Sequence, residues 1–273
     1  MNSKPLVSRA IAHFYNKASE ETRLDKGMGI FEFERTKILI EKHINFLSGR
    51  IIDVGGGTGK YSAWLASKGH EVHLVEPVLK HVAIAKERAH ASRHKFTVYQ
   101  GIAQKLDFPD NFADLVILHG PLYHLQRKEE RLKAIAEAKR VTKKGGIILG
   151  VAINRTAKTL VGLLQGLIHH KSFFQLCKEE ISTGVHPFSD DYPWLLADAY
   201  YHKPDELRAE FEEIGLNFLT IYALEGMCWL DKNYFASLAN PARKATLMEL
   251  LALTENDTYF LPFSPHMLIA LKK

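Results

Sequence analysis

Segments with the character of strands and helices alternate along most of this 273-residue chain, and this alternation constrains the fold more than any other feature. Short apolar runs at residues 50–54, 114–118 and 147–153 are typical of buried strands. Residues 128–141 carry apolar side chains at helical spacing, so we expect a helix there. Strands separated by helices favour a parallel sheet that helices cover on both faces. The sequence therefore predicts an α/β fold.

The other predicted elements follow from the same periodicity and from the turn residues between them. Helices are expected over residues 7–24, 31–47, 59–67, 78–89, 203–214 and 241–253, and strands over 71–76, 96–99, 217–224 and 266–271. On the second helix, the predicted inner face carries Phe33, Ile40, Ile44 and Leu47. A turn is expected at residues 143–146, where two lysines precede two glycines.

The alternation stops at residues 155–202, which combine a helical apolar stripe with a polar and aromatic stretch. We interpret this segment as a lid or substrate-binding insertion that lies over the sheet. Two predicted helices precede the first strand, so residues 1–48 are expected to form a helical extension. The predicted core then consists of residues 49–154 and 203–273.

Composition limits the class of protein. With 46% hydrophobic and 25% charged residues, the chain can build an ordinary core. Cys177 and Cys228 form neither a CxxC pair nor a metal-ligand spacing, and the adjacent His169 and His170 lack spaced partners. We therefore expect reduced cysteines and no metal.

Charge and hydropathy bear on partners and location. The net charge of +5 is modest, and the basic residues are spread among acidic ones, which disfavours a nucleic-acid partner. The amino-terminal stretch lacks the apolar run of a signal peptide, and the apolar residues 160–168 are too few to cross a bilayer. We expect a cytoplasmic protein without membrane contact, and the sequence leaves its oligomeric state open.

A glycine-rich segment after the first predicted strand carries the strongest functional signal. Residues 53–59 read DVGGGTG and lead into a predicted helix. Glycines allow sharp turns and close ligand approach, and a helix amino terminus adds free N–H groups. Glu76 closes the next strand, near the spacing expected of a carboxylate that binds ribose hydroxyls. This acid favours a ligand site over the alternative, a turn that binds nothing.

Two better-known loop patterns do not fit. The dinucleotide fingerprint GxGxxG, counted from Gly55, meets Lys60 where its last glycine should be. No GK[ST] ends the loop, so the phosphate-binding P-loop pattern fails as well. The pattern present is DxGxGxG, and a dehydrogenase is therefore disfavoured.

Residues 51–77, IIDVGGGTGKYSAWLASKGHEVHLVEP, resemble the first two motifs of class I S-adenosylmethionine-dependent methyltransferases of the small-molecule type. The later segments 101–108, 113–125, 132–150 and 199–229 are also similar to that family. The resemblance implies a doubly wound, mostly parallel seven-stranded Rossmann-like sheet with an antiparallel last strand. It also implies S-adenosylmethionine as the cofactor.

The resemblance assigns roles to particular residues. Asp53 would fix the glycine loop or the amine at the methionine end, and Glu76 would bind both ribose hydroxyls. Family members often carry an Asp in the adenine loop, and Gln104 is expected to substitute for it here. The full set of expected cofactor-binding residues is Asp53, Gly55, Gly57, Gly59, Glu76, Pro77, Ala103, Gln104 and His119.

Methyl transfer is an in-line displacement, so the protein must mainly align donor and acceptor, and a neutral hydroxyl acceptor also needs a base. The loop 119–125 follows a predicted strand and should face the methyl group. His124 and Tyr123 are the catalytic candidates, with His119 and His202 as further candidate bases. The alternative for each histidine is an imidazole bonded to a loop carbonyl, and for Tyr123 it is simple packing.

Aromatic residues of the insertion suggest a flat or apolar acceptor. The substrate-binding candidates are Tyr192, Trp194, Tyr201 and His202. The alternative is a lid that packs these side chains against the sheet. The amino-terminal helices, with Tyr15 and Arg23, are expected to close over the cofactor.

Three functions are compatible with these motifs. A methyltransferase acting on a small O, N or C acceptor is favoured by the lid-like insertion. An RNA or other nucleic-acid methyltransferase is disfavoured, because His-Gly-Pro-Leu at 119–122 lacks the Asn/Asp-Pro-Pro-aromatic motif of base amino-group enzymes. A non-catalytic module that only binds S-adenosylmethionine would carry the same glycine loop and Glu76.

Overall fold

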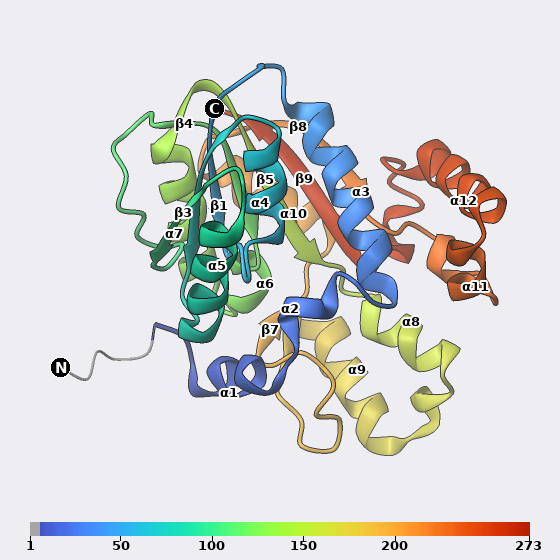
Figure 1. Cartoon of the computed structure of the whole chain (residues 1–273). Coiled ribbons are helices and arrows are strands. Elements are labelled where there is room, and N and C mark those ends of the chain that lie inside the picture. Colours follow the sequence, from blue (N-terminus) through green and yellow to red (C-terminus); the bar gives the residue numbers. More distant parts are fainter. Residues whose placement is uncertain (1–5) are drawn as a thin grey trace.

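The computed structural model describes residues 6–273 and centres on a seven-stranded sheet in the order β3-β2-β1-β4-β5-β9-β8 (Figure 1). Strands β1 to β5 run parallel, and β9 is antiparallel to both β5 and β8. The predicted α/β fold class with its antiparallel last strand is therefore confirmed. In sheet order, the strands span Thr97–Gln100, Glu71–Glu76, Arg50–Val54, Ala113–His119, Thr142–Ile153, His266–Lys272 and Asn217–Ala223.

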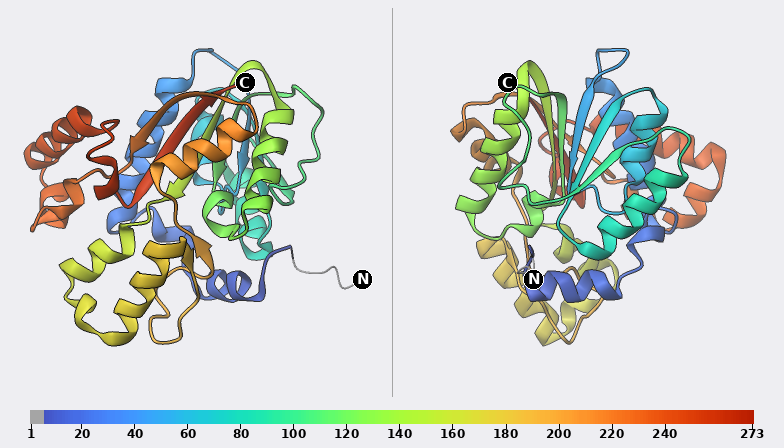
Figure 2. Two further views of the ribbon diagram at one scale, coloured as in Figure 1. Left: turned by 180° about the vertical axis from the view of Figure 1, so that it is seen from behind. Right: turned by 60° about the vertical axis from the view of Figure 1, so that its left-hand side comes forward.

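Helices cover both faces of the sheet and bury a separate apolar core on each (Figure 2). One core takes side chains from α7 (Lys128–Val141) and α10 (Pro204–Glu213). The other takes them from α3 (Met28–His43), α4 (Lys60–Ser67) and α5 (Leu79–Ala91). Two-sided burial explains why β1, β4 and β5 are apolar runs without alternation.

The amino-terminal extension was predicted over residues 1–48, of which residues 1–5 lie outside the described residues. Within the described part, two details differ from the prediction. The single helix expected over 7–24 is wrong: α1 (Arg9–Lys17) and α2 (Glu20–Arg23) are separated by Ala18, whose ψ of 142° is extended. The expectation that Leu47 faces inward is also wrong, because α3 ends at His43 and Leu47 is 99% exposed.

The segment after β5 folds into α8 (Ala157–Leu164), α9 (Lys171–Thr183) and the two-stranded pair of β6 (Val185–His186) and β7 (Ala199–Tyr200). These elements and α1 lie at the same end of the sheet (Figure 1). The remaining helices are α6 (Pro121–His124), α11 (Tyr234–Ala239), α12 (Pro241–Thr254) and the short turns Leu167–His169, Cys228–Leu230 and Leu261–Phe263. The boundaries of extension, core and lid stay a prediction.

One predicted turn lies inside a strand. Residues 143–146 bulge out of β5 between the pairs Ala113–Thr142 and Leu115–Ile147, and Gly145 has a positive φ of 78°. Gly145 therefore adopts a turn conformation as expected, but Thr142 pairs with β4 and the strand begins there.

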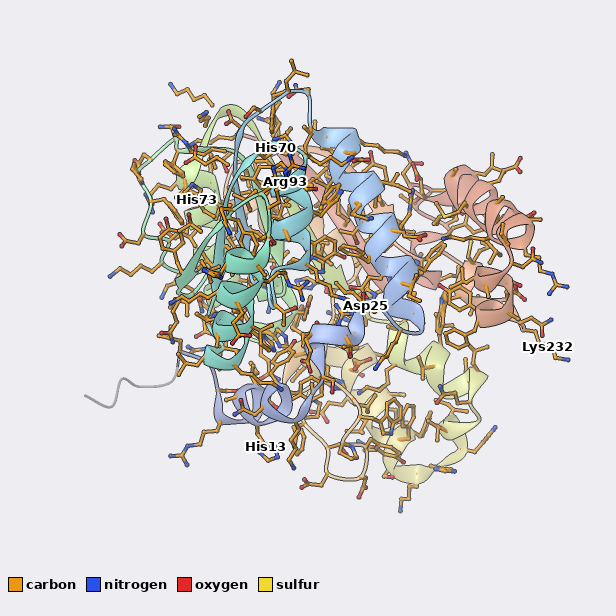
Figure 3. The ribbon with its side chains drawn as sticks, viewed as in Figure 1. His13, Asp25, His70, His73, Arg93 and Lys232 are labelled. Carbon is orange, nitrogen blue, oxygen red and sulfur yellow. The ribbon has the colours of Figure 1, made fainter. Side chains whose placement is uncertain are left out.

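The parallel strands have their carboxyl ends where α1 and the insertion lie. His13 and Asp25 are at this end of the sheet, and His70 and Arg93 are at the opposite end (Figure 3). Ligands of open α/β sheets bind beyond the carboxyl ends of the strands, so this end positions the candidate site. Residues 6–273 include no helix with the length and hydropathy of a membrane span. A cytoplasmic location stays a prediction.

Candidate active site

A first cavity of about 440 Å³ opens at the carboxyl ends of β1, β2 and β4. Most residues expected to bind the cofactor or act in catalysis line it together: Gly55, Gly57, Glu76, Pro77, Ala103, Gln104, His119, Tyr123 and His124. Asp53 and Gly59 do not line it. The chain therefore brings nine predicted site residues into one cavity from four separate segments.

The glycine loop between β1 and α4 uses its glycines for different reasons. A Cβ on Gly55 would lie 2.4 Å from the carbonyl oxygen of His119, so Gly55 lets the loop pack against the end of β4. Gly57 has a φ of +55°, and a Cβ there would meet nothing within 4 Å. Gly57 also lines the first cavity, so its missing side chain leaves the backbone open toward that space.

Asp53 lies beneath the glycine loop, fully buried at the end of β1. The Ser62 hydroxyl donates a 2.6 Å hydrogen bond to Oδ2 of Asp53, whereas Oδ1 has no partner within residues 6–273. Burial raises the pKa of Asp53 to about 6, against the lowering effect of the Ser62 bond. The position suits the predicted role of fixing the loop, since Oδ2 lies where a Cβ on Gly56 would clash.

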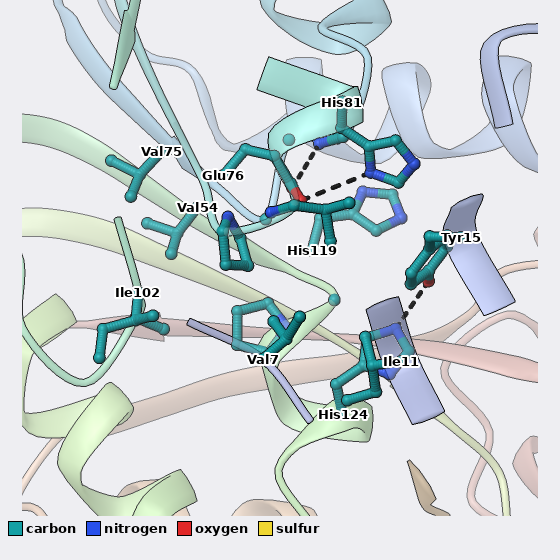
Figure 4. A pocket seen from close by; sticks show the side chains of 18 of the residues that line it. Val7, Ile11, Tyr15, Val54, Val75, Glu76, His81, Ile102, His119 and His124 are labelled. Atoms are coloured by element: carbon teal, nitrogen blue, oxygen red, sulfur yellow. Dashed lines mark hydrogen bonds and ion pairs between the residues drawn. The ribbon is translucent and has the colours of Figure 1, made fainter. Parts of the chain in front are cut away.

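The Glu76 carboxylate is oriented from three sides at the end of β2 (Figure 4). Its Oε2 accepts the backbone N–H of Gly57 at 3.1 Å, and its Oε1 accepts that of Val78 at 2.9 Å. His81 Nδ1 lies 3.4 Å from Oε1. Each oxygen keeps capacity for one more bond, so the group can accept from two neighbouring hydroxyls. Sequence reasoning missed His81, which lies outside the apolar stripe of α5 and belongs to no motif.

The loop after β4 meets the amino-terminal helix α1 across the cavity (Figure 4). The hydroxyl of Tyr15 and Nε2 of His124 lie 2.7 Å apart, a hydrogen-bond distance. Burial lowers the pKa of His124 to about 4, so its imidazole is neutral near pH 7. Burial also raises the pKa of Tyr123, which keeps that phenol protonated.

A second cavity of about 210 Å³ adjoins the first. Five residues border both cavities: Tyr15, Glu20, Arg23, His119 and Tyr123. Sequence reasoning pointed to four of these but gave Glu20 no role. His119 is buried and its pKa is lowered by that burial to about 4, so it is a neutral imidazole on the common wall.

Charged side chains from distant parts of the chain meet at the second cavity. Arg23 donates to both oxygens of Glu32, at 2.6 and 3.1 Å, and to Glu20 at 2.7 Å. Despite burial, Arg23 holds the pKa of Glu32 at about 2. His266 donates from Nδ1 to Glu225 at 2.7 Å; burial alone would lower its pKa, but Glu225 raises it to about 9.

Glu32, Glu225 and His266 were not expected at the site. Glu32 lies on a helix for which the sequence analysis considered only the apolar face. His266 is the first residue of the last strand. Their ligating atoms lie within 4.8 Å of one another, the one such group of three found within residues 6–273. Because these atoms already pair with Arg23 and with each other, we assign no metal to them.

The predicted substrate residues line neither cavity. Tyr192 packs on Phe173 with ring centroids 5.1 Å apart, and Trp194 is 54% exposed. Tyr201 stacks on His186 at 5.0 Å. His202 is buried beside Glu210, 3.4 Å away, and burial lowers its pKa. Tyr192 and Tyr201 pack within the insertion, His202 lies against Glu210 of α10, and Trp194 is largely exposed. A substrate role for these four residues stays a prediction.

Known proteins share both sequence and fold with this chain. Residues 52–150 match the family described as a methyltransferase domain. A ubiquinone/menaquinone biosynthesis C-methyltransferase UbiE from Vibrio cholerae is 29% identical over 184 residues, 65% of this chain and 67% of the relative. An uncharacterized methyltransferase from Bacillus cytotoxicus is 26% identical over 198 residues, 72% of this chain and 83% of the relative.

Solved structures agree in fold. A SAM-dependent methyltransferase from Methanosarcina mazei has a TM-score of 0.60 at 18% identity, covering 86% of this chain and 96% of its own. A possible histamine N-methyltransferase from Thermotoga maritima has a TM-score of 0.58 at 18% identity, covering 97% and 98%. The architecture is thus the Rossmann-like methyltransferase fold. The matching domain and the relatives support a class I S-adenosylmethionine-dependent methyltransferase.

Proposed function

We propose that this enzyme binds S-adenosylmethionine in the first cavity and transfers its methyl group to an O, N or C atom of a small molecule in the second. One observation carries the proposal: the two cavities share a wall. A methyl group held on one side and an acceptor held on the other would meet there. Alignment of the two supplies much of the rate enhancement in such a displacement.

The first cavity suits the cofactor on three counts. Gly57 leaves backbone open where a side chain would intrude. Glu76 has bonding capacity on both oxygens for the two ribose hydroxyls. Ala103 and Gln104 lie on the same cavity and would border the adenine. S-adenosylmethionine supplies a methyl group on a positively charged sulfur that leaves as a thioether.

The residues on the common wall have distinct roles in the proposal. His119 is neutral near pH 7 and would accept a proton released by the acceptor. Tyr123 stays protonated and would donate a hydrogen bond to the acceptor. His124 borders only the first cavity, and its Nε2 is engaged by Tyr15, so we assign it the positioning of Tyr15.

The test uses purified protein, methyl-labelled S-adenosylmethionine and a cell extract separated into metabolites, RNA and protein. We expect label in a small product. Both carbon and nitrogen acceptors belong among the products sought, because C-methylation and N-methylation occur in the names of similar proteins. Label confined to RNA or protein would contradict the proposal, as would a failure of S-adenosylhomocysteine to bind.

A further inference from the structure

The polar edge of the second cavity offers hydrogen-bond donors, and the carboxylate of Glu32 is engaged on both oxygens. Arg23 uses three of its five N–H bonds on Glu20 and Glu32, and within residues 6–273 the other two have no partner. Both oxygens of Glu32 already accept from Arg23, and its side chain is only 6% exposed, against 41% for Arg23. A ligand at this edge therefore meets free N–H groups of Arg23. Among the carboxylates that line the cavity, the oxygen without a partner within residues 6–273 is Oε2 of Glu20.

His266 adds a second donor. Its Nδ1 donates to Glu225, which is fully buried and also accepts from the hydroxyl of Ser264 and the backbone N–H of His266. The other ring nitrogen, Nε2, has no hydrogen bond within residues 6–273. His266 lines the second cavity and not the first. Because Glu225 raises the pKa of His266 to about 9, the ring carries a positive charge near pH 7.

We propose that the second cavity selects acceptors that carry an oxygen anion, such as a carboxylate or an ionised phenol or enol, and that Nε2 of His266 binds this oxygen. The inference rests on the proposed function, since it gives the acceptor cavity its chemistry. A charged N–H donor and an anionic oxygen form one of the stronger hydrogen bonds in proteins. The engaged carboxylates of Glu32 and Glu225 offset the charges without filling the cavity.

The size of the cavity suits an acceptor of about one ring. An apolar cavity of about 150 Å³ holds benzene, so about 210 Å³ admits a ring with a small substituent. The apolar part of the lining comes from Phe14, Val151, Ile153 and Leu196. These side chains would pack on the ring while His266 binds its anionic group.

The carboxylate of the cofactor is the other possible source of an oxygen anion at this wall. Arg23 borders both cavities, so its free N–H bonds can serve either ligand. His266 borders the second cavity alone, and the proposal therefore depends on His266. Saturating the protein with S-adenosylhomocysteine separates the two sources, because its own carboxylate is then already bound.

The experiment measures binding of three probes of similar shape to the protein saturated with S-adenosylhomocysteine. Benzoate, benzyl alcohol and benzylamine carry negative, neutral and positive groups, and NMR titration at pH 7.5 ranks their affinities. We expect benzoate to bind at least fivefold more tightly than the other two. Benzylamine is the most informative competitor, because Oε2 of Glu20 has no hydrogen-bond partner within residues 6–273.

Two variants assign the preference to His266. His266→Asn keeps an amide donor to Glu225 but removes Nε2, so it should abolish the preference for benzoate. The matched control is His90→Asn, at an exposed histidine of α5. Both variants should bind S-adenosylhomocysteine within twofold of the wild type. Benzylamine binding most tightly, or a benzoate preference that persists in His266→Asn, would overturn the inference.

A measurement on the wild type guards against misfolding of the variant. The groups that face His266 are Glu225 after β8, Glu32 on α3, Arg23 on α2 and His119 on β4. His266 should lose its positive charge as the pH rises from 7 to 10, so benzoate affinity should fall across that range while benzyl alcohol affinity stays level. A level benzoate profile would also overturn the inference. If S-adenosylhomocysteine does not bind at all, the proposed function itself has failed.

Discussion

At the scale of single residues, the candidate site depends on backbone that is left bare and on a carboxylate that is held still. Gly57 leaves a gap where any other residue would place a side chain. Glu76 is fixed by the N–H groups of Gly57 and Val78, which couples the glycine loop to the end of β2. Loop and carboxylate thus form one unit, and changes at either should affect the same ligand.

Replacing Glu76 by Ala should weaken S-adenosylhomocysteine binding by about 1–3 kcal/mol, since charged hydrogen bonds to two hydroxyls are lost. Glu76→Gln keeps an acceptor oxygen and should lose less. Isothermal titration calorimetry measures both. The control is Glu71→Ala, at the exposed start of the same strand. Unchanged affinity in Glu76→Ala would remove this residue from the site.

Replacing Gly57 by Val should abolish detectable S-adenosylhomocysteine binding, because the side chain would enter the first cavity. The positive φ adds a strain of about 1–2 kcal/mol, which lowers stability. Gly69→Val is a matched control, since Gly69 also has a positive φ and open space but lies after α4. Calorimetry and circular dichroism together separate the two effects. Equal affinities in both variants would contradict the loop assignment.

At the scale of elements, residues of the amino-terminal helices line both cavities, and a lysine of α5 holds α1 in place. Lys80 of α5 donates from Nζ to the carbonyl oxygens of Tyr15, Asn16 and Ala18, at 3.3, 3.1 and 2.9 Å. A lysine at a helix carboxyl terminus satisfies carbonyls that lack helical partners and complements the helix dipole. Lys80 thereby holds α1 in the place where Tyr15 reaches His124.

Replacing Lys80 by Met should loosen α1 while leaving the sheet intact. Hydrogen–deuterium exchange should become faster across residues 9–18, because up to about 2 kcal/mol of charge–dipole and hydrogen-bond stabilisation is lost. Lys86→Met, at an exposed position of the same helix, is the control. Equal exchange in both variants would show that other contacts hold α1.

At the scale of the whole molecule, ion pairs join separate segments of the chain around the site. Glu225 and His266 connect the segment after β8 to the start of β9, and Arg23 and Glu32 connect α2 to α3. Arg131 of α7 and Glu210 of α10 form a further buried pair on the first of the two cores. Breaking a buried pair costs more than a surface pair, because the remaining charge stays desolvated.

The His266–Glu225 pair should make stability depend on pH. The pKa of His266 is about 9 in the folded protein and near 6.5 unfolded. Its contribution, about 3 kcal/mol, is therefore fully present below pH 6.5 and is lost as pH rises through 9. Denaturant unfolding of the wild type and His266→Asn should differ most at low pH and converge by pH 10. A constant difference would contradict the raised pKa.

Local sequence patterns were enough to predict much of the fold and part of the candidate site. The alternation of apolar runs and helical stripes predicted the parallel sheet, because burial on both faces leaves that signature in each strand. The glycine loop and Glu76 could be placed together, because carboxyl ends of parallel strands meet at one edge. Where local and tertiary requirements coincide, as at Gly57, sequence reasoning reached the cavity.

Only the tertiary structure showed the second cavity and the contacts that the side chains of the insertion make. Tyr201 and His202 are residue types that often line binding sites. In the folded chain, Tyr201 stacks on His186 and His202 lies beside Glu210. Glu32 and His266 had no signal of their own, since their roles come from partners on other segments, Arg23 on α2 and Glu225 after β8. Pairing between remote charges leaves no periodicity in a single sequence, and it becomes visible once the chain has folded.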